Sequence, residues 1–205
     1  MKGVLRSKKV PLLVVLSGPS GAGKDAVLSR MRELGLLFHY TVTATTRPKR
    51  AGEKEGTDYC FLPEAEFQRM LQGGALLESA KVYSHWYGVP KQQVKQALDE
   101  GKDVILKIDV QGAATIRKLL PEAVLIFLTL PGIEDYEQRL RQRKTESDAE
   151  LKVRLGRVSE EMKSLPLFDY LVLNNQGELD AAVANIRAIV AAEKCRVNPR
   201  IVELR

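Results

Sequence analysis

The feature that most constrains the fold of this chain is a glycine-rich turn between a strand-like run and a helix-like run. Residues 10–17 form an apolar stretch rich in valine and leucine, which is typical of a strand buried on both faces of a sheet. Residues 25–34 repeat apolar side chains near helical spacing, and Gly35 ends that run. The turn between them reads Gly18, Pro19, Ser20, Gly21, Ala22, Gly23 and Lys24. A strand, a tight turn and a helix in this order predict an α/β fold.

The residues of this turn have the spacing of a phosphate-binding loop, or P-loop. Glycines permit positive φ angles that point successive backbone N–H groups at an anion, and the following helix adds its positive N-terminal dipole. Lys24 is placed to reach the outer phosphates of a nucleoside triphosphate. The alternative is a purely structural turn, which the strand, the lysine and the helix in register disfavour. We therefore expect a nucleoside triphosphate to bind here.

Two acidic residues are candidates for a Mg²⁺ site. Asp25 follows Lys24, where such a loop usually has a Ser or Thr that ligates the metal. Its carboxylate is also a hard-oxygen ligand for Mg²⁺. The equal alternative is that Asp25 only stabilises the first turn of its helix through the helix dipole. Asp109 ends a predicted buried strand over residues 103–109, a common place for the second metal-site acid. Lys107 points to the same face of that strand as Asp109.

The remainder of the chain alternates between strand-like and helix-like segments. Further buried strands are predicted over 123–130 and 170–173. Helices are predicted over 94–100, 111–120, 133–143, 148–164 and 178–192. This alternation predicts a parallel sheet flanked by helices.

Residues 40–90 break the alternation. Short strands are predicted over 40–45, 58–62 and 76–83, with one helix over 64–72. This segment is interpreted as a small α+β insertion in a core made of residues 1–39 and 91–205.

The basic surplus of the chain lies at its two ends. Lysine and arginine number 32 against 26 acidic residues, a net charge of +6 that by itself suggests nucleic acid or an anionic membrane. Residues 1–9 carry +4 and residues 194–205 carry +3, which leaves −1 for residues 10–193. We expect solvated tails, and neither nucleic acid nor membrane as a partner. Two cysteines and no apolar run near the roughly 18 residues of a membrane span favour a cytoplasmic protein.

Taken in order, these segments resemble guanylate kinases over nearly the whole chain. Besides the loop, the resemblance rests on residues 45–48, 50–53, 56–59, 87–88 and 108–112 and on Arg139, Arg143 and Arg154. It implies a P-loop NTPase core, an inserted GMP-binding domain over residues 40–90 and a mobile helical lid over about 134–158. It also implies an ATP-dependent kinase that transfers the γ-phosphoryl group of ATP to GMP and dGMP, in purine nucleotide metabolism.

The resemblance assigns side chains to each nucleotide. ATP binding is implied for Gly18, Pro19, Ser20, Gly21, Ala22, Gly23, Lys24, Asp25 and Asn174. GMP binding is implied for Thr43, Arg47, Arg50, Tyr59, Glu78, Tyr87 and Asp109. Catalytic roles are implied for Lys24, Arg47, Arg139, Arg143 and Arg154, and Mg²⁺ is the implied cofactor with Asp25 and Asp109 as its ligands. Glu78 suits guanine because one carboxylate accepts from both N1–H and N2–H₂, whereas adenine lacks the N1 proton.

Two positions depart from the family pattern in a way that resembles an exchange of charge. Asp25 replaces the loop hydroxyl, and Lys107 stands where the family usually carries an acid. We expect the two side chains to lie close enough to interact and to preserve the metal and phosphate environment together.

Two alternatives to the kinase remain open: a non-catalytic guanylate-kinase-like module that binds peptides, and a related kinase of a phosphorylated sugar. The intact loop and lid arginines disfavour the first, and Glu78 with Thr43 disfavours the second. The oligomeric state is left open.

Overall fold

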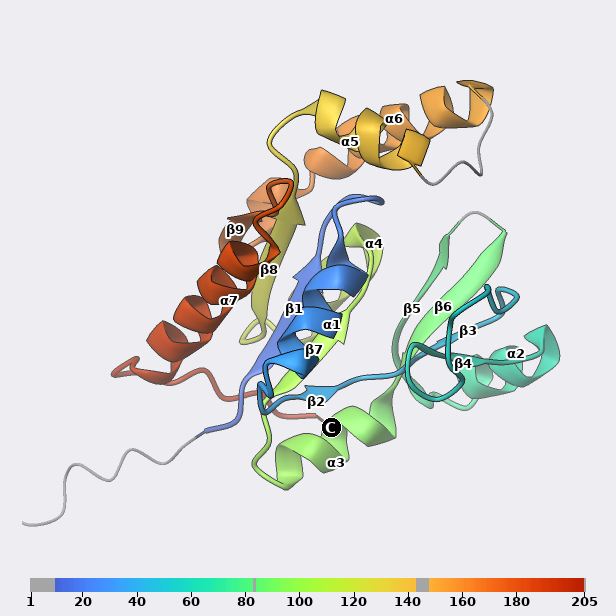
Figure 1. The fold of residues 1–205 in the computed structure, drawn as a ribbon. Coiled ribbons are helices and arrows are strands. Elements are labelled where there is room, and N and C mark those ends of the chain that lie inside the picture. Colours follow the sequence, from blue (N-terminus) through green and yellow to red (C-terminus); the bar gives the residue numbers. More distant parts are fainter. Residues whose placement is uncertain (1–9, 83, 143–147, 205) are drawn as a thin grey trace, which may run out of the picture.

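The core of the fold is a five-stranded parallel sheet with the strand order β2-β7-β1-β8-β9 (Figure 1). The structure, a computed structural model, describes residues 10–82, 84–142 and 148–204. The strands are β1 Leu13–Ser17, β2 His39–Tyr40, β7 Val104–Lys107, β8 Val124–Thr129 and β9 Tyr170–Leu173. Every residue of β1 and β8 is buried, as expected for central strands covered on both faces. The predicted α/β class with a parallel sheet is confirmed.

Helices cover both faces of this sheet. Val14 and Leu16 of β1 pack with α1 (Lys24–Glu33) and α7 (Leu179–Lys194) on one face. Leu13 and Val15 point to the other face, against α3 (Lys91–Asp99) and α4 (Val110–Leu119). Of the helices that the structure describes, none is long and apolar enough to cross a membrane.

Because the strands are parallel, their carboxyl ends meet at one edge of the sheet. The glycine-rich loop follows β1 at this edge, Lys107 ends β7, and Asn174 follows β9. Two further helices, α5 (Ile133–Gln142) and α6 (Asp148–Met162), lie beyond the same edge (Figure 1). A short 3₁₀ helix, Leu165–Leu167, leads from α6 back to β9. Ligands of open parallel sheets bind at this edge, so the candidate residues lie where a site is expected.

A second sheet stands to one side of the core, in the strand order β4-β3-β6-β5 (Figure 1). Its strands are β3 Thr43–Thr45, β4 Tyr59–Phe61, β5 Leu76–Val82 and β6 His85–Pro90. The helix α2 (Glu64–Gln72) packs on it through Phe67, which stacks on Trp86 with 5.9 Å between ring centroids.

Two details of this region differ from the prediction. The strand predicted over 40–45 is two strands, because β2 pairs with β7 in the core sheet and only β3 belongs to the second sheet. The chain leaves the core at Val42, whose backbone N–H donates to the Gln93 side chain instead of a strand. Strand β6 was not predicted, because Gly88 and Pro90 are poor strand formers, yet antiparallel pairing with β5 buries Gly88.

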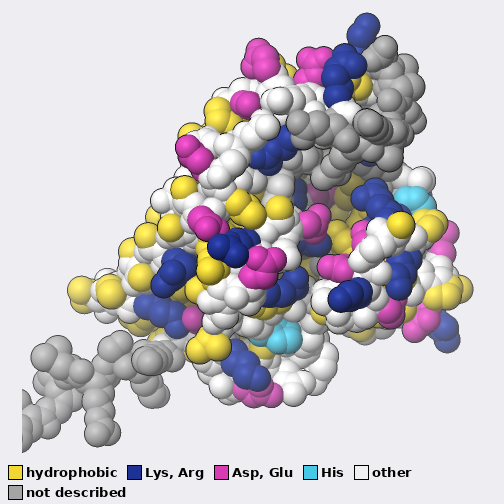
Figure 2. Space-filling view, in the orientation of Figure 1, with side chains coloured by type: hydrophobic (Ala, Val, Ile, Leu, Met, Phe, Trp, Pro, Cys, Tyr) yellow, Lys and Arg dark blue, Asp and Glu magenta, His cyan; other side chains and the backbone are white. Residues whose placement is uncertain are grey.

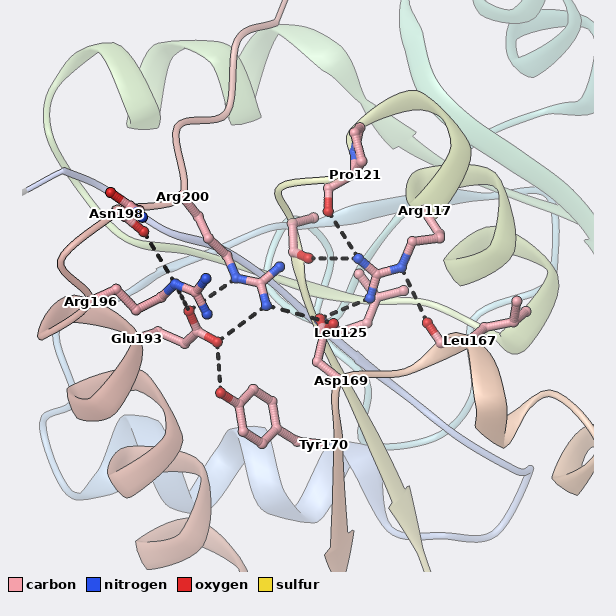
Figure 3. Close-up of polar contacts among 11 residues, drawn as sticks. Arg117, Pro121, Leu125, Leu167, Asp169, Tyr170, Glu193, Arg196, Asn198 and Arg200 are labelled. Carbon is pink, nitrogen blue, oxygen red and sulfur yellow. Dashed lines mark hydrogen bonds and ion pairs between the residues drawn. The ribbon is translucent and has the colours of Figure 1, made fainter.

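The C-terminal segment, predicted to be solvated, is exposed over residues 194–199 but docks on the core through Arg200 (Figure 3). Arg200 donates from Nε to Glu193 Oε2 at 3.0 Å, and its Nη2 lies 3.6 Å from Asp169 Oδ1. Tyr170 donates from its hydroxyl to Glu193 Oε1 at 2.6 Å. Glu193 is 2% exposed, so Arg200 offsets the cost of burying its negative charge. Arg200 of the basic C-terminal segment therefore compensates the protein's own acids. Residues 1–9 lie outside the described part of the chain.

Charges of both signs share the surface. Figure 2 shows lysine and arginine side chains interspersed with aspartate and glutamate side chains over the described part of the face it draws. A continuous basic stripe, the usual footprint of a nucleic-acid-binding face, is not seen on this face among the described residues.

The first glycine of the loop has no room for a side chain. Gly18 has φ +136°, and a Cβ at this position would lie 2.0 Å from the carbonyl oxygen of Leu128 in β8. We expect Gly18→Ala to lower the free energy of unfolding by about 3 kcal/mol or more, because backbone atoms of a central strand would have to move.

Gly35→Ala is the matched control for this substitution. Gly35 also has a positive φ, +67°, but a Cβ there meets nothing within 4 Å. Its cost is therefore only the backbone strain of roughly 1 kcal/mol. Urea denaturation of both variants measures the difference, and equal losses of stability would contradict the steric explanation.

Candidate active site

The glycine-rich loop is arranged around the side chain of Lys24. Gly21 and Gly23 have φ angles of +92° and +94°, which a residue with a side chain rarely adopts. Lys24 donates from Nζ to the carbonyl oxygens of Gly18 at 2.6 Å and Pro19 at 3.1 Å. Both acceptors are uncharged. Burial lowers the pKa of Lys24, and the nearby carboxylates Glu161, Asp25 and Asp109 oppose this effect. An anionic ligand would offset the cost of burying this charge.

Asn174 and Arg139, to which the resemblance assigns ATP-binding and catalytic roles, lie against the middle of the loop. Asn174 donates from Nδ2 to the Ala22 carbonyl at 2.8 Å. Arg139 donates from Nη2 to the Asn174 carbonyl at 2.8 Å and from Nη1 to the Ala22 carbonyl at 3.4 Å. A Cβ at Gly23 would lie 2.4 Å from Asn174 Nδ2, so this approach also requires glycine. The structure thus brings Asn174, Arg139 and the loop together, while their role in ATP binding stays a prediction.

Glu161 contacts the loop and was missed by the sequence reasoning. The backbone N–H of Ser20 donates to its Oε2 at 3.0 Å, which links α6 to the loop. Burial raises the pKa of Glu161, opposed by the Ser20 hydrogen bond and the charge of Lys24. The sequence gives little signal here, because Glu161 follows a second glutamate, Glu160. The two look alike in the sequence, yet Glu160 is exposed and pairs with Lys163 on the surface of the same helix.

The helices α5 and α6 carry the predicted lid residues. Tyr136 anchors α5 to the end of β8, with its hydroxyl 2.8 Å from Thr129 Oγ1. Arg154 lies half-buried on α6, seven residues before Glu161. Arg143 lies outside the described residues.

Two buried polar side chains share one face of the second sheet. Ala44 pairs with Gly88, so Thr43 falls in register with Val89, and Val89 pairs with Glu78. Residues in register across antiparallel strands point to the same face, which places Thr43 and Glu78 about 10 Å apart on either side of β6. Within the described chain, Thr43 Oγ1 and Glu78 Oε2 have no hydrogen-bond partner. Burial, with the nearby charge of Asp109, raises the pKa of Glu78 to about 8.

Asp109 caps the helix that faces Glu78. It is the N-cap of α4, and its Oδ1 accepts from the backbone N–H of Gly112 at 2.8 Å. Gly112 lies close to Glu78, and a Cβ at this position would be 2.6 Å from Glu78 Oε2. Burial raises the pKa of Asp109, and the Gly112 hydrogen bond opposes the shift. The strand predicted to end at Asp109 ends at Lys107, since the cap takes Asp109 out of the sheet.

Arg47 forms the centre of a second group on this sheet. Its guanidinium contacts both carboxylate oxygens of Glu53, at 2.7 and 3.1 Å, and stacks 5.2 Å from the ring centroid of Tyr59. The rings of Tyr59 and Tyr87 meet edge to face at 6.1 Å. Arg50 has an exposed side chain and joins the group through its backbone N–H, which donates to Glu53. Glu53 is the residue that orients Arg47, a role that its place in the motif did not reveal.

The predicted contact between Asp25 and Lys107 is confirmed. Lys107 Nζ lies 2.5 Å from Asp25 Oδ1 and 4.2 Å from the ring centroid of Tyr59. The Lys107 side chain is 12% exposed and that of Asp25 79%. Burial alone would lower the pKa of Lys107, but Asp25 and Tyr59 raise it further than burial lowers it. The amine therefore carries a positive charge at neutral pH.

The described protein atoms alone do not form a metal cage. Among the described residues, no group of three or more His, Cys, Asp or Glu side chains could hold a metal ion. Mg²⁺ in phosphoryl-transfer sites is usually held by one or two carboxylates together with substrate phosphates and water. The hard oxygens of Asp25 and Asp109, both close enough to Lys24 to affect its pKa, fit this mode of binding.

This arrangement matches that of known proteins along most of the chain. The family model described as "Guanylate kinase" matches residues 11–193. "Guanylate kinase 2, chloroplastic/mitochondrial" of Oryza sativa subsp. japonica is 45% identical, over 95% of this chain and 68% of its own. The guanylate kinase of Caldanaerobacter subterraneus subsp. tengcongensis is also 45% identical, over 93% and 92%. The crystal structure of guanylate kinase from Anaplasma phagocytophilum has a TM-score of 0.75 at 31% identity, covering 93% of this chain and 89% of that one. The chain belongs to the guanylate kinase family.

Proposed function

We propose that this protein transfers the γ-phosphoryl group of ATP to GMP, giving ADP and GDP. The observation that supports this most directly is the buried carboxylate of Glu78, which shares a face with Thr43 and has an oxygen without a partner in the described chain. A buried, unpaired polar atom is costly, and guanine offsets the cost because N1–H and N2–H₂ donate to one carboxylate. The Thr43 hydroxyl supplies a further hydrogen bond to the base.

The phosphate of GMP binds, in this proposal, to the group around Arg47. A guanidinium offers forked donors that match phosphate oxygens, and Glu53 already holds the Arg47 fork in one orientation. The hydroxyls of Tyr59 and Tyr87 and the exposed side chain of Arg50 complete the set. The segment over residues 40–90 then acts as the GMP-binding domain.

The chemistry requires placement and charge neutralisation rather than a strong base. An oxygen of the GMP phosphate forms the new bond to the γ-phosphorus while the bond to the bridging oxygen breaks, and ADP keeps that electron pair. Lys24 and the backbone N–H groups of the loop hold the triphosphate, and Arg139, Arg143 and Arg154 neutralise charge when α5 and α6 close over it. Asp25 and Asp109 would hold Mg²⁺, which would supply further neutralisation of phosphate charge.

A coupled assay of ADP release with ATP and Mg²⁺ tests this function. GMP and dGMP are expected to be phosphorylated, whereas kcat/KM for AMP and UMP is expected to be lower by a factor of about 100 or more. A phosphorylated sugar serves as a fifth acceptor and is expected to give no ADP above background. Absence of turnover with GMP, together with intact peptide binding, would instead indicate a non-catalytic module.

A further inference from the structure

Lys107 lies where the two proposed nucleotide sites meet, and the sequence pattern assigns it no contact with a substrate. It stands at the carboxyl end of β7, next to the loop, yet its ammonium contacts residues from two other elements. One is Asp25 at the start of α1, at 2.5 Å, and the other is Tyr59 on β4, at 4.2 Å from the ring centroid. Lys107 thereby joins the P-loop helix to the second sheet.

Lys107 and Arg47 both lie against the ring of Tyr59. The Arg47 guanidinium lies 5.2 Å from the Tyr59 ring centroid, and the Lys107 ammonium lies 4.2 Å from it. Lys107 also acts on Lys24, whose pKa it lowers through charge repulsion. The ammonium is thus near the cation that holds the triphosphate and near the cation proposed to hold the GMP phosphate.

From this geometry we propose that Lys107 is a catalytic residue that binds the GMP phosphate on the side facing ATP, and that Asp25 is the residue that positions it. The proposal rests on the proposed function. In phosphoryl transfer two strongly anionic groups must approach, and an ammonium between them offsets their repulsion. A lysine suits this place because it acts as a compact point charge on a flexible stem.

Asp25 can hold Lys107 without competing strongly with a phosphate. Its side chain is 79% exposed, so water competes for its oxygens and weakens the ion pair, although the Lys107 side chain is only 12% exposed. A phosphate dianion offers more charge and more acceptor oxygens than one carboxylate. Asp25 therefore keeps the ammonium in place in the free enzyme and shares it with GMP on binding.

Lys107→Met tests the proposal by comparing GMP with guanosine, which lacks the phosphate. Calorimetric titration without ATP is expected to show GMP binding weakened about tenfold or more, because one charge-assisted contact is lost, with guanosine binding unchanged. The coupled assay is expected to show a lower kcat as well. Unchanged guanosine binding also reports that the variant is folded. Lys107→Arg, which keeps the charge, is expected to recover part of the GMP affinity.

The matched control is a second lysine–aspartate pair outside the site. Lys95 on α3 pairs with Asp99 at 3.1 Å on the surface, and Lys95→Met is expected to leave both ligands and the rate unchanged.

The double variant Lys107→Met with Asp25→Asn separates a phosphate contact from simple neutralisation of Asp25. If Lys107 only cancels the charge of Asp25, removing both charges restores GMP affinity in titrations without ATP, and the proposal is wrong. If Lys107 binds phosphate, the double variant stays as weak for GMP as Lys107→Met. A wild-type protein that neither binds nor phosphorylates GMP would refute the proposed function and this role together. Wild-type activity with an unchanged GMP-to-guanosine ratio in Lys107→Met would refute only the role of Lys107.

Discussion

Glu78→Gln is expected to reduce kcat/KM for GMP by about 1000-fold. The carboxylate accepts two hydrogen bonds from guanine, whereas the amide offers one acceptor and directs a donor at the N1–H or N2–H₂ group. The same amide can donate to N1 of adenine and accept from its N6 amine, so the preference for GMP over AMP is expected to shrink. Coupled assays with both acceptors measure the ratio. Glu66→Gln, an exposed glutamate on α2, is the control, and full activity of Glu78→Gln with GMP would contradict the assignment.

The same substitution is expected to stabilise the free protein at alkaline pH. The pKa of Glu78 is raised to about 8 from 4.5, so between these values the folded state holds a proton that the unfolded state has released. Stability therefore falls as pH rises through this window, and a glutamine, which does not titrate, escapes the loss. Relative to the wild type, Glu78→Gln is expected to gain about 3 kcal/mol or more between pH 5 and pH 8.

Urea denaturation at pH 5 and pH 8 without nucleotide checks this gain. A difference between variant and wild type that is the same at both pH values would show that the carboxyl is not buried as described. Higher stability together with lower activity in Glu78→Gln would show that Glu78 serves ligand binding at a cost in stability of the fold.

The core sheet was predictable from the sequence because its strands are buried on both faces. Such strands appear as continuous apolar runs, so the run over 123–130 predicted β8 to within a residue at each end, and β9 over 170–173 agrees at both ends. The second sheet was less predictable, because its strands are short and pair with partners distant in sequence. Strand β6 contains Gly88 and Pro90, and only its pairing with β5 makes it a strand.

Residues of the candidate site were predictable where their own chemistry and spacing mark them. Residues that only position such a neighbour were less predictable. The glycines and Lys24 were predicted from their local spacing. The contact between Asp25 and Lys107 was predicted because Asp25 adds an acid to the family pattern and Lys107 replaces one with a base. Glu53 and Glu161 act on other residues through orientations that depend on the folded chain. Glu161 differs from Glu160 only in the side of α6 on which it lies, and that side is set by packing.

Lys24→Met is expected to lower kcat by about 1000-fold, since a cation that binds developing charge in a phosphoryl transfer is lost. Methionine keeps an unbranched stem of similar length, so the loop can retain its shape. Burial lowers the pKa of Lys24, which means that the folded protein bears a cost for this charge in the absence of a ligand. Removing the ammonium is therefore expected to leave the free energy of unfolding unchanged or higher.

A combined measurement of kcat and urea denaturation distinguishes this outcome from simple damage to the loop. Lys163→Met is the control, because Lys163 is a 71% exposed lysine on α6 that pairs only on the surface with Glu160. If Lys24→Met kept the wild-type kcat, the loop would have no part in the phosphoryl transfer. A loss of both activity and stability would show instead that the contacts of Lys24 with Gly18 and Pro19 hold the loop together, which would make its role structural.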